Sequence, residues 1–233
     1  MLERGLKTKN KERLKFLGQY LQNNMQILEL GCAEGSFGEA IKHNFIVTYY
    51  GIEPSHDAEI AATKLDKIWR SSEEIPKNMQ FNLILAFHVL EHIHNIGRII
   101  FKLYELLSED GIVIIEVPNC FGNKLLPWDF NKEHIHLFRF TSISCLLEKH
   151  GFNIKGIGTD YYESAIYKDS MRIVACKRKS SKELKNNLVD RFRQYLGNEY
   201  VVYGIGGDFE ALVRPYIKIS NILGIIDSSK NKI

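Results

Sequence analysis

The chain has 233 residues, of which 45% are hydrophobic and 25% charged, and its formal net charge at pH 7 is only +3. This composition is typical of a soluble globular protein with a sizeable core. A nucleic-acid binder would usually carry a basic stripe, and the basic clusters here, at residues 7–15 and 177–182, are short. No apolar run approaches eighteen residues, so no membrane span is expected. The N-terminal residues lack an apolar leader, which predicts a cytoplasmic protein.

The cysteines indicate neither a metal knuckle nor a disulfide framework. They are far apart in the sequence and no CxxC pair is present, which fits a reducing compartment. The four are Cys32, Cys120, Cys145 and Cys176.

The first half of the chain alternates between helical and strand patterns. Leucines at helical spacing predict a covering helix over residues 6–22. Strands follow at residues 25–30 and 47–53, with a helix over residues 36–44, for which Ser36 is a possible N-cap. A second helix is predicted over residues 55–65 and a weak third strand over residues 67–70.

The second half continues this alternation and then closes with two strands. A strong strand covers residues 81–87, and an amphipathic helix covers residues 95–111 and ends at Gly111. The run at residues 112–119 predicts a strand buried on both faces. A helix begins at Thr141 or Ser142 and ends at residue 151. The strands at residues 152–162 and 170–178 are joined by a short link, which predicts an antiparallel edge hairpin.

These elements predict an α/β fold with a seven-stranded, mostly parallel sheet and helices on both faces. The pattern ends near Arg178, so we expect one domain over residues 1–178. Residues 179–233 read as a linker followed by an incomplete second β-α-β segment with a glycine turn at Gly204, Gly206 and Gly207. Two strands and a helix bury too little surface to stand alone, so we expect a truncated piece of a longer protein. A natural extension packed on the main domain is the alternative.

The glycine turn that follows the first strand predicts a nucleotide-type cofactor site, because it lets backbone N–H groups approach a ligand closely. A dinucleotide site requires G-x-G-x-x-G, and Ala33 occupies the second glycine position between Gly31 and Gly35. Two acids, Glu29 and Glu34, stand where they would repel a pyrophosphate. They suit a cationic ligand that carries no phosphate.

This pattern resembles the first motif of the class I S-adenosylmethionine-dependent methyltransferases, which commonly reads acid-x-Gly-x-Gly-x-Gly. The resemblance covers about residues 25–178 and implies a Rossmann-like fold with S-adenosylmethionine as cofactor and S-adenosylhomocysteine as product. Glu53, at the end of the second strand, is the acid expected to accept the ribose hydroxyls. The cofactor-binding residues that the resemblance implies are Glu29, Gly31, Cys32, Ala33, Glu34, Gly35, Phe37, Glu53, Pro54, Ser71, Ser72, Phe87 and His88.

The segment "FHVLEHIHN" resembles the part of small-molecule methyltransferases that follows the fourth strand. The segments "LLSEDGIVIIEVPN" and "HIHLFRFTSISCLLEKHGF" resemble a branch of this family that methylates small polar metabolites, including sugars of surface polysaccharides and quinone precursors. Five histidines in these segments follow the fourth and fifth strands, at the sheet edge where ligands bind in open α/β folds. Methylation of a hydroxyl requires loss of a proton, and histidine has a suitable pKa near pH 7. The candidate catalytic residues are His134 or His92 as general base, with His88 and His136 beside them.

Three further expectations concern the acceptor pocket. Trp128 is a candidate for packing against an acceptor ring, and Arg139 for binding an anionic group. A divalent metal held by Glu91, His92 and one of His134 or His136 is an option, with His134 preferred, because their N/O ligands suit such an ion.

The preferred function is O-methylation of a small polar acceptor, such as a sugar, nucleotide-sugar or phosphorylated intermediate of surface polysaccharide biosynthesis. An NAD-type nucleotide-binding module without methyl transfer is the alternative from another class. A methyltransferase of RNA, protein or a quinone precursor also stays open.

Overall fold

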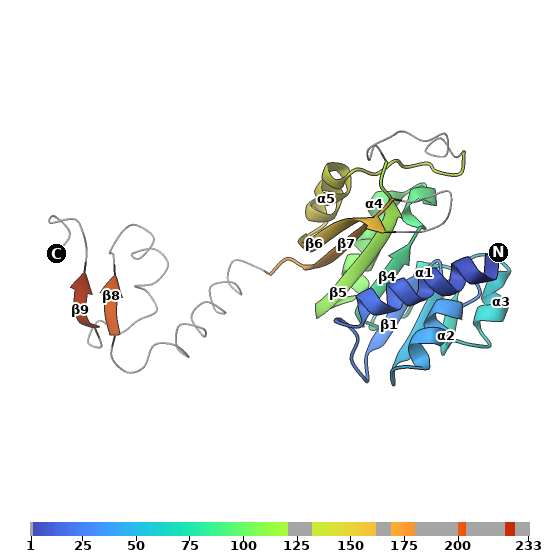
Figure 1. Ribbon diagram of the computed structural model, residues 1–233, viewed down its shortest axis with the longest axis horizontal. Helices are drawn as coiled ribbons and strands as arrows, with labels where there is room; N and C mark the ends of the chain where they lie inside the picture. Colours follow the sequence, from blue (N-terminus) through green and yellow to red (C-terminus); the bar gives the residue numbers. More distant parts are fainter. Residues whose placement is uncertain (1, 121–131, 162–168, 180–199, 204–221, 227–233) are drawn as a thin grey trace. The chain divides into compact units, whose positions relative to one another are not determined.

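The computed structural model describes residues 2–120, 132–161, 169–179, 200–203 and 222–226. The chain divides into two compact units, Met1–Arg178 and Lys179–Ile233. The first contains the seven-stranded sheet and its helices (Figure 1). Trp128 lies outside the described residues.

The sheet has the strand order β3-β2-β1-β4-β5-β7-β6. The strands β3, β2, β1, β4 and β5 pair in parallel, whereas β7 runs antiparallel to both of its neighbours. This confirms the predicted seven-stranded, mostly parallel sheet with an antiparallel edge hairpin. The strands are β1 (Gln26–Leu30), β2 (Thr48–Ile52), β3 (Lys67–Trp69), β4 (Phe81–Phe87), β5 (Leu107–Pro118), β6 (Phe152–Tyr161) and β7 (Ser170–Lys177).

Helices cover both faces of the sheet because strand side chains alternate between the faces. In β5, Val113 and Ile115 join the core beneath α4 and α5, while Ile114 joins the core beneath α1 and α2. The opposite placement of these two helix groups is visible in Figure 1. The helices are α1 (Leu2–Leu17), α2 (Ser36–Lys42), α3 (Asp57–Ala61), α4 (Ile96–Leu106) and α5 (Phe140–Lys149), with 3-10 turns η1 (Ser72–Glu74) and η2 (Leu90–His92).

Two predicted helix boundaries near glycines are wrong. Ser36 is the first residue of α2 rather than its N-cap; the cap is Gly35, in the left-handed region at φ 75°. Gly111 does not end α4, because that helix ends at Leu106 and β5 begins at once. A Cβ on Gly111 would lie 2.8 Å from Leu107 Cδ1 and 2.9 Å from the Phe81 carbonyl oxygen. Close strand packing, rather than helix capping, therefore explains this glycine.

The other helices are shifted or shortened. The α3 helix spans only Asp57–Ala61, against a prediction of residues 55–65. The α5 helix begins one residue early at Phe140, with Arg139 as its N-cap. The Ser142 hydroxyl stabilises this start, since it accepts the backbone N–H of Arg139 at 3.0 Å. Ser142 is thus a capping partner and not the first residue.

The second unit contains a parallel pair, β8 (Tyr200–Tyr203) and β9 (Ile222–Ile226). Its glycine turn, Gly204 to Gly207, lies outside the described residues. Across the part of the chain that the structure describes, helices are too short or too polar to cross a membrane.

Candidate active site

The glycine loop after β1 is held in conformations that favour glycine. Gly31 and Gly35 have φ angles of 71° and 75°, and Ala33 between them has a φ of 46°. The Gly31 N–H donates to the Ile52 carbonyl at 2.9 Å, which attaches the loop to β2. A Cβ on Gly31 would come within 2.9 Å of Val89 Cγ2, in the turn after β4. Glycine is required here both by the backbone conformation and by the close approach of this turn.

Glu53 closes the other side of the loop. It is buried at the end of β2, and its Oε2 accepts the Ala33 N–H at 2.9 Å. Its Oε1 accepts the Ser55 N–H at 3.0 Å. Pro54, between Glu53 and Ser55 in the sequence, is exposed. The carboxylate therefore fixes the glycine loop to the end of β2 and places an acid beside it.

Beneath the loop, Glu29 is buried and faces the core on the α1/α2 side. Its Oε2 accepts the Tyr49 hydroxyl at 2.8 Å. Burial, with a further contribution from Glu29, raises the pKa of Tyr49 well above its usual range. Burial together with Glu29 and Glu53 also raises the pKa of Cys32 to about 12. Glu34, by contrast, is exposed.

The remaining predicted cofactor residues form two groups. Phe37 on α2 and Phe87 at the end of β4 pack edge to face, with ring centroids 5.5 Å apart. The Arg13 guanidinium lies 4.4 Å from the centroid of the Phe87 ring. Ser71 and Ser72 stand after β3, where the Ser72 hydroxyl donates to Glu73 at 3.1 Å.

His88 follows β4 in a left-handed conformation, at φ 51°. Its Nδ1 lies 3.2 Å from Glu91 Oε1, and its Nε2 lies 3.0 Å from the Ser170 hydroxyl and 3.4 Å from Glu116 Oε1. Burial lowers the pKa of His88, but hydrogen bonds to Glu116 and Glu91 outweigh burial, so the pKa is raised overall. The half-buried ring therefore lies between two buried carboxylates, those of Glu91 and Glu116.

Glu116 on β5 links this histidine to α1. Its carboxylate accepts Arg13 Nε at 3.1 Å and Arg172 Nε at 2.7 Å, and both guanidinium groups also donate through Nη2. Burial would raise the pKa of Glu116, but His88 and the two arginines hold it well below its usual range. This network was not predicted from the sequence. The available signal was opposite charges, Glu116 and Arg172, inside two otherwise apolar strands.

Three of the predicted residues meet in one cluster beyond β4. One carboxylate oxygen of Glu91 and one ring nitrogen each of His92 and His134 all lie within 4.8 Å of one another. The ring centroids of His92 and His134 are 4.9 Å apart. Desolvation by burial lowers the pKa of His134, outweighing the nearby Glu91 carboxylate.

The last two candidates take separate positions. The His136 ring nitrogen Nε2 lies 2.9 Å from the Ile93 carbonyl, so this ring holds the backbone of the η2 turn. Arg139 is exposed at the N-cap of α5.

The loop and its neighbours fit S-adenosylmethionine. Arginine and lysine are absent from the loop residues 31–35, whereas buried carboxylates stand below it and beside it. A site with this charge disfavours a pyrophosphate, and it suits a positively charged sulfonium compound. Gly31, Ala33, Gly35 and Glu53 are the residues that would hold the cofactor, which supplies an activated methyl group when bound.

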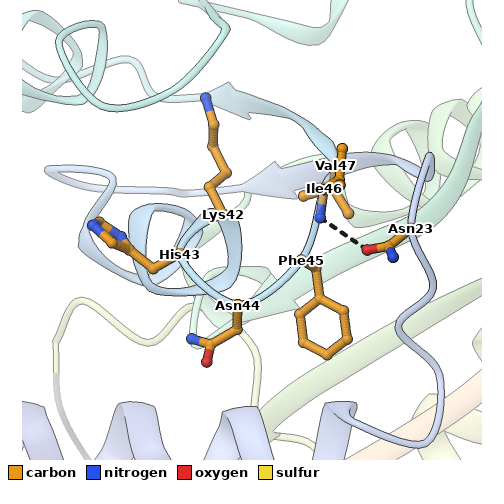
Figure 2. A pocket seen from close by; sticks show the side chains of 7 residues that line it. All are labelled: Asn23, Lys42, His43, Asn44, Phe45, Ile46 and Val47. Carbon is orange, nitrogen blue, oxygen red and sulfur yellow. Dashed lines mark hydrogen bonds between the residues drawn. The ribbon is translucent and has the colours of Figure 1, made fainter.

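A separate open hollow of about 530 Å³ lies at the opposite end of β2. Figure 2 shows it lined by Asn23 and residues 42–47, where the Ile46 N–H donates to Asn23 at 2.9 Å. Residues 42–47 connect α2 to the start of β2, whereas ligands in open α/β sheets bind at the carboxyl ends of strands. None of the predicted site residues lines this hollow.

Comparisons with known proteins identify the family of the chain. The family model described as a methyltransferase domain matches residues 2–155. A ubiquinone biosynthesis O-methyltransferase of Bradyrhizobium diazoefficiens is 26% identical over 104 residues, which cover 41% of this chain and 40% of the relative. The matches thus span about two fifths of the length of the curated relatives.

Solved structures share the fold at low sequence identity. A Bacillus halodurans methyltransferase superposes with a TM-score of 0.58 at 13% identity, covering 71% of this chain and 99% of that one. Magnesium protoporphyrin IX methyltransferase of Synechocystis, with bound S-adenosylhomocysteine, gives a TM-score of 0.58 at 15% identity, covering 75% and 84%. Because the family model matches more than half of the chain, the chain belongs to the methyltransferase domain family.

Proposed function

We propose that the chain is an S-adenosylmethionine-dependent methyltransferase that transfers the methyl group to an oxygen of a small polar acceptor. The observation that carries this proposal is the cluster of Glu91, His92 and His134. Its first two residues follow β4 as the glycine loop follows β1. These two strands are neighbours and parallel, so both segments stand at the same edge of the sheet. A methyl donor and a group of proton acceptors at one edge suit a hydroxyl that must lose its proton.

The reaction mainly requires the protein to align the two reactants and to remove a proton from the acceptor hydroxyl. The acceptor oxygen attacks the methyl carbon in line while the bond from carbon to sulfur breaks, and the hydroxyl proton leaves. Holding the two reactants in line is worth roughly 7–11 kcal/mol, and a positioned base contributes about 10²- to 10⁴-fold. His134 is our first candidate for the base, because a lowered pKa keeps its ring neutral at pH 7.

The choice of acceptor rests on the curated relatives and on the sequence resemblance. The names of the curated relatives, ubiquinone biosynthesis O-methyltransferases, favour oxygen as the methylated atom and support a hydroxylated quinone precursor. A sugar or nucleotide-sugar of surface polysaccharide assembly rests only on the sequence resemblance. We therefore rank a phenolic hydroxyl ahead of a sugar hydroxyl. For the second unit, we propose a nucleotide-type segment.

The test is methyl transfer from labelled S-adenosylmethionine to two panels of acceptors, one of dihydroxylated aromatic acids and one of sugars and nucleotide-sugars. His134→Ala should retain S-adenosylhomocysteine binding and lose turnover by at least about 100-fold. His43→Ala is the matched control, because His43 is exposed at the opposite end of the sheet. Full activity of His134→Ala would remove this residue from the mechanism, and methylation confined to nitrogen acceptors would refute the oxygen assignment.

A further inference from the structure

We propose that Glu91, His92 and His134 bind one divalent transition-metal ion. Their three ligand atoms lie within 4.8 Å of one another. Ligands about 2.1 Å from a tetrahedral ion stand roughly 3.4 Å apart, so a modest side-chain rotation completes the ligand set. The role of the ion in turnover rests on the proposed function, whereas its binding does not.

Glu91 provides the strongest observation. Its side chain is 1% exposed, and Oε1 is already engaged by His88 at 3.2 Å. Among the described residues, Oε2 has no hydrogen-bond partner. A buried carboxylate oxygen without a partner is costly. A cation at the cluster would supply the missing partner.

His92 is held in the tautomer that a metal ligand needs. Its Nδ1 lies 2.9 Å from the carbonyl oxygen of Glu133. A carbonyl only accepts hydrogen bonds, so Nδ1 carries the proton and the Nε2 lone pair is left for an ion. A backbone carbonyl that orients an imidazole in this way is the usual outer partner of metal-binding histidines.

The position of His134 is fixed by its neighbours. The Glu91 carbonyl accepts the N–H groups of Ile135 and His136, at 2.8 and 3.1 Å. The His136 ring adds a bond to the Ile93 carbonyl at 2.9 Å. Residues 134–136 are thereby fastened to the η2 turn, which carries the other two ligands. The cluster is therefore a built arrangement rather than a chance meeting of surface side chains.

The donor set selects the class of ion. Magnesium and calcium prefer ligand sets made of oxygen, whereas two imidazoles and one carboxylate suit zinc, manganese, cobalt or iron(II). Three protein ligands also leave an open position on the ion. An acceptor hydroxyl bound there would have a lowered pKa. Its proton would pass to solvent, and the oxygen would attack the methyl carbon while the bond from that carbon to sulfur breaks. In this case His134 serves as a ligand and not as the base.

Binding is tested on the full chain after removal of metals with a chelator, by calorimetric titration with Zn²⁺ and by the visible absorption of added Co²⁺. We expect one ion per chain and at least tenfold weaker binding of Mg²⁺. Glu91→Gln and His92→Ala should each weaken Co²⁺ binding by at least tenfold. His92 is exposed, so His92→Ala keeps the test valid where Glu91→Gln fails to fold. His94→Ala, an exposed histidine of the same segment outside the cluster, should bind Co²⁺ as the wild type does.

Absence of Co²⁺ binding, or equal binding by wild type and both cluster variants, would overturn the inference. The role of the ion is tested by turnover of an accepted substrate before and after the metal is restored, and we expect at least a tenfold gain. Full turnover by the metal-free enzyme would overturn that role and leave His134 as the base. The metal proposal and the proposed O-methylation therefore fail separately.

Discussion

The carboxylate of Glu53 accepts a hydrogen bond from the backbone N–H of Ala33 at 2.9 Å. This bond links the segments that follow the paired strands β1 and β2. This single bond fixes the loop residue that sits between the two left-handed glycines. It also turns a carboxylate toward the loop. The geometry of the proposed cofactor site therefore depends on an acid that follows the neighbouring strand.

Replacing Glu53 with alanine should weaken cofactor binding while the protein stays folded. A hydrogen bond to a charged group contributes about 1.5–3 kcal/mol, which corresponds to roughly a 10- to 100-fold loss of affinity. Calorimetric titration with S-adenosylhomocysteine measures the effect. Glu59→Ala, which removes an exposed acid from α3, should bind as the wild type does. Equal affinity of the Glu53 variant and the wild type would contradict this role.

Substitution of Gly38 by alanine should destabilise the first unit from within. A Cβ at this position would lie 2.5 Å from Tyr49 Cε1 and 2.6 Å from Leu65 Cδ2. Overpacking of this kind costs about 1–3 kcal/mol, which lowers the melting temperature by roughly 2–12 °C in a domain of this size. Gly156→Ala is the matched control, because a Cβ there meets no described atom within 4 Å. An unchanged melting temperature for Gly38→Ala would show that the core has room at this point.

Patterning was sufficient to predict the seven strands of the sheet, because most were short apolar or β-branched runs bounded by turn residues. It misplaced the end of α4, where the apolar run passes from helix to strand without a break and Gly111 serves close packing instead. The proximity of Glu91, His92 and His134 was predicted. The loops that follow parallel strands lie at the same edge of the sheet. The charge network around Glu116 was not predicted. It depends on which face of β5 meets α1, and strand alternation alone does not give that face.

The stability of the enzyme in acid should depend on Glu116. The pKa of this carboxylate is held below its ordinary value of 4.5. Its contribution to stability is therefore complete above about pH 4.5 and is lost as pH falls below that value. Glu116→Gln leaves two buried guanidinium groups poorly paired, so at pH 7 it should cost about 3–5 kcal/mol.

The difference in melting temperature between wild type and Glu116→Gln should consequently narrow as pH falls from 7 to 3. Thermal scans at intervals across this range measure it. Glu105→Gln, which removes an exposed acid from α4, should differ little from the wild type at every pH. A difference that stays constant down to pH 3 would mean that the pKa of Glu116 is the same in the native and unfolded protein, and would contradict a lowered pKa in the native state.

The thiol of Cys32 should resist modification although it belongs to the cofactor loop. Its pKa is raised to about 12, chiefly by burial and then by Glu29 and Glu53. Only the thiolate is the nucleophile, and at pH 8 a thiol of this pKa is ionised to roughly one part in ten thousand. Cys145 is exposed and serves as the internal reference. Mass spectrometry after iodoacetamide treatment should therefore find Cys145 modified and Cys32 intact in the folded protein, with both modified in urea. Equal labelling of Cys32 and Cys145 without denaturant would show that the loop opens readily. It would also show that burial and the carboxylates of Glu29 and Glu53 do not suppress ionisation of the Cys32 thiol.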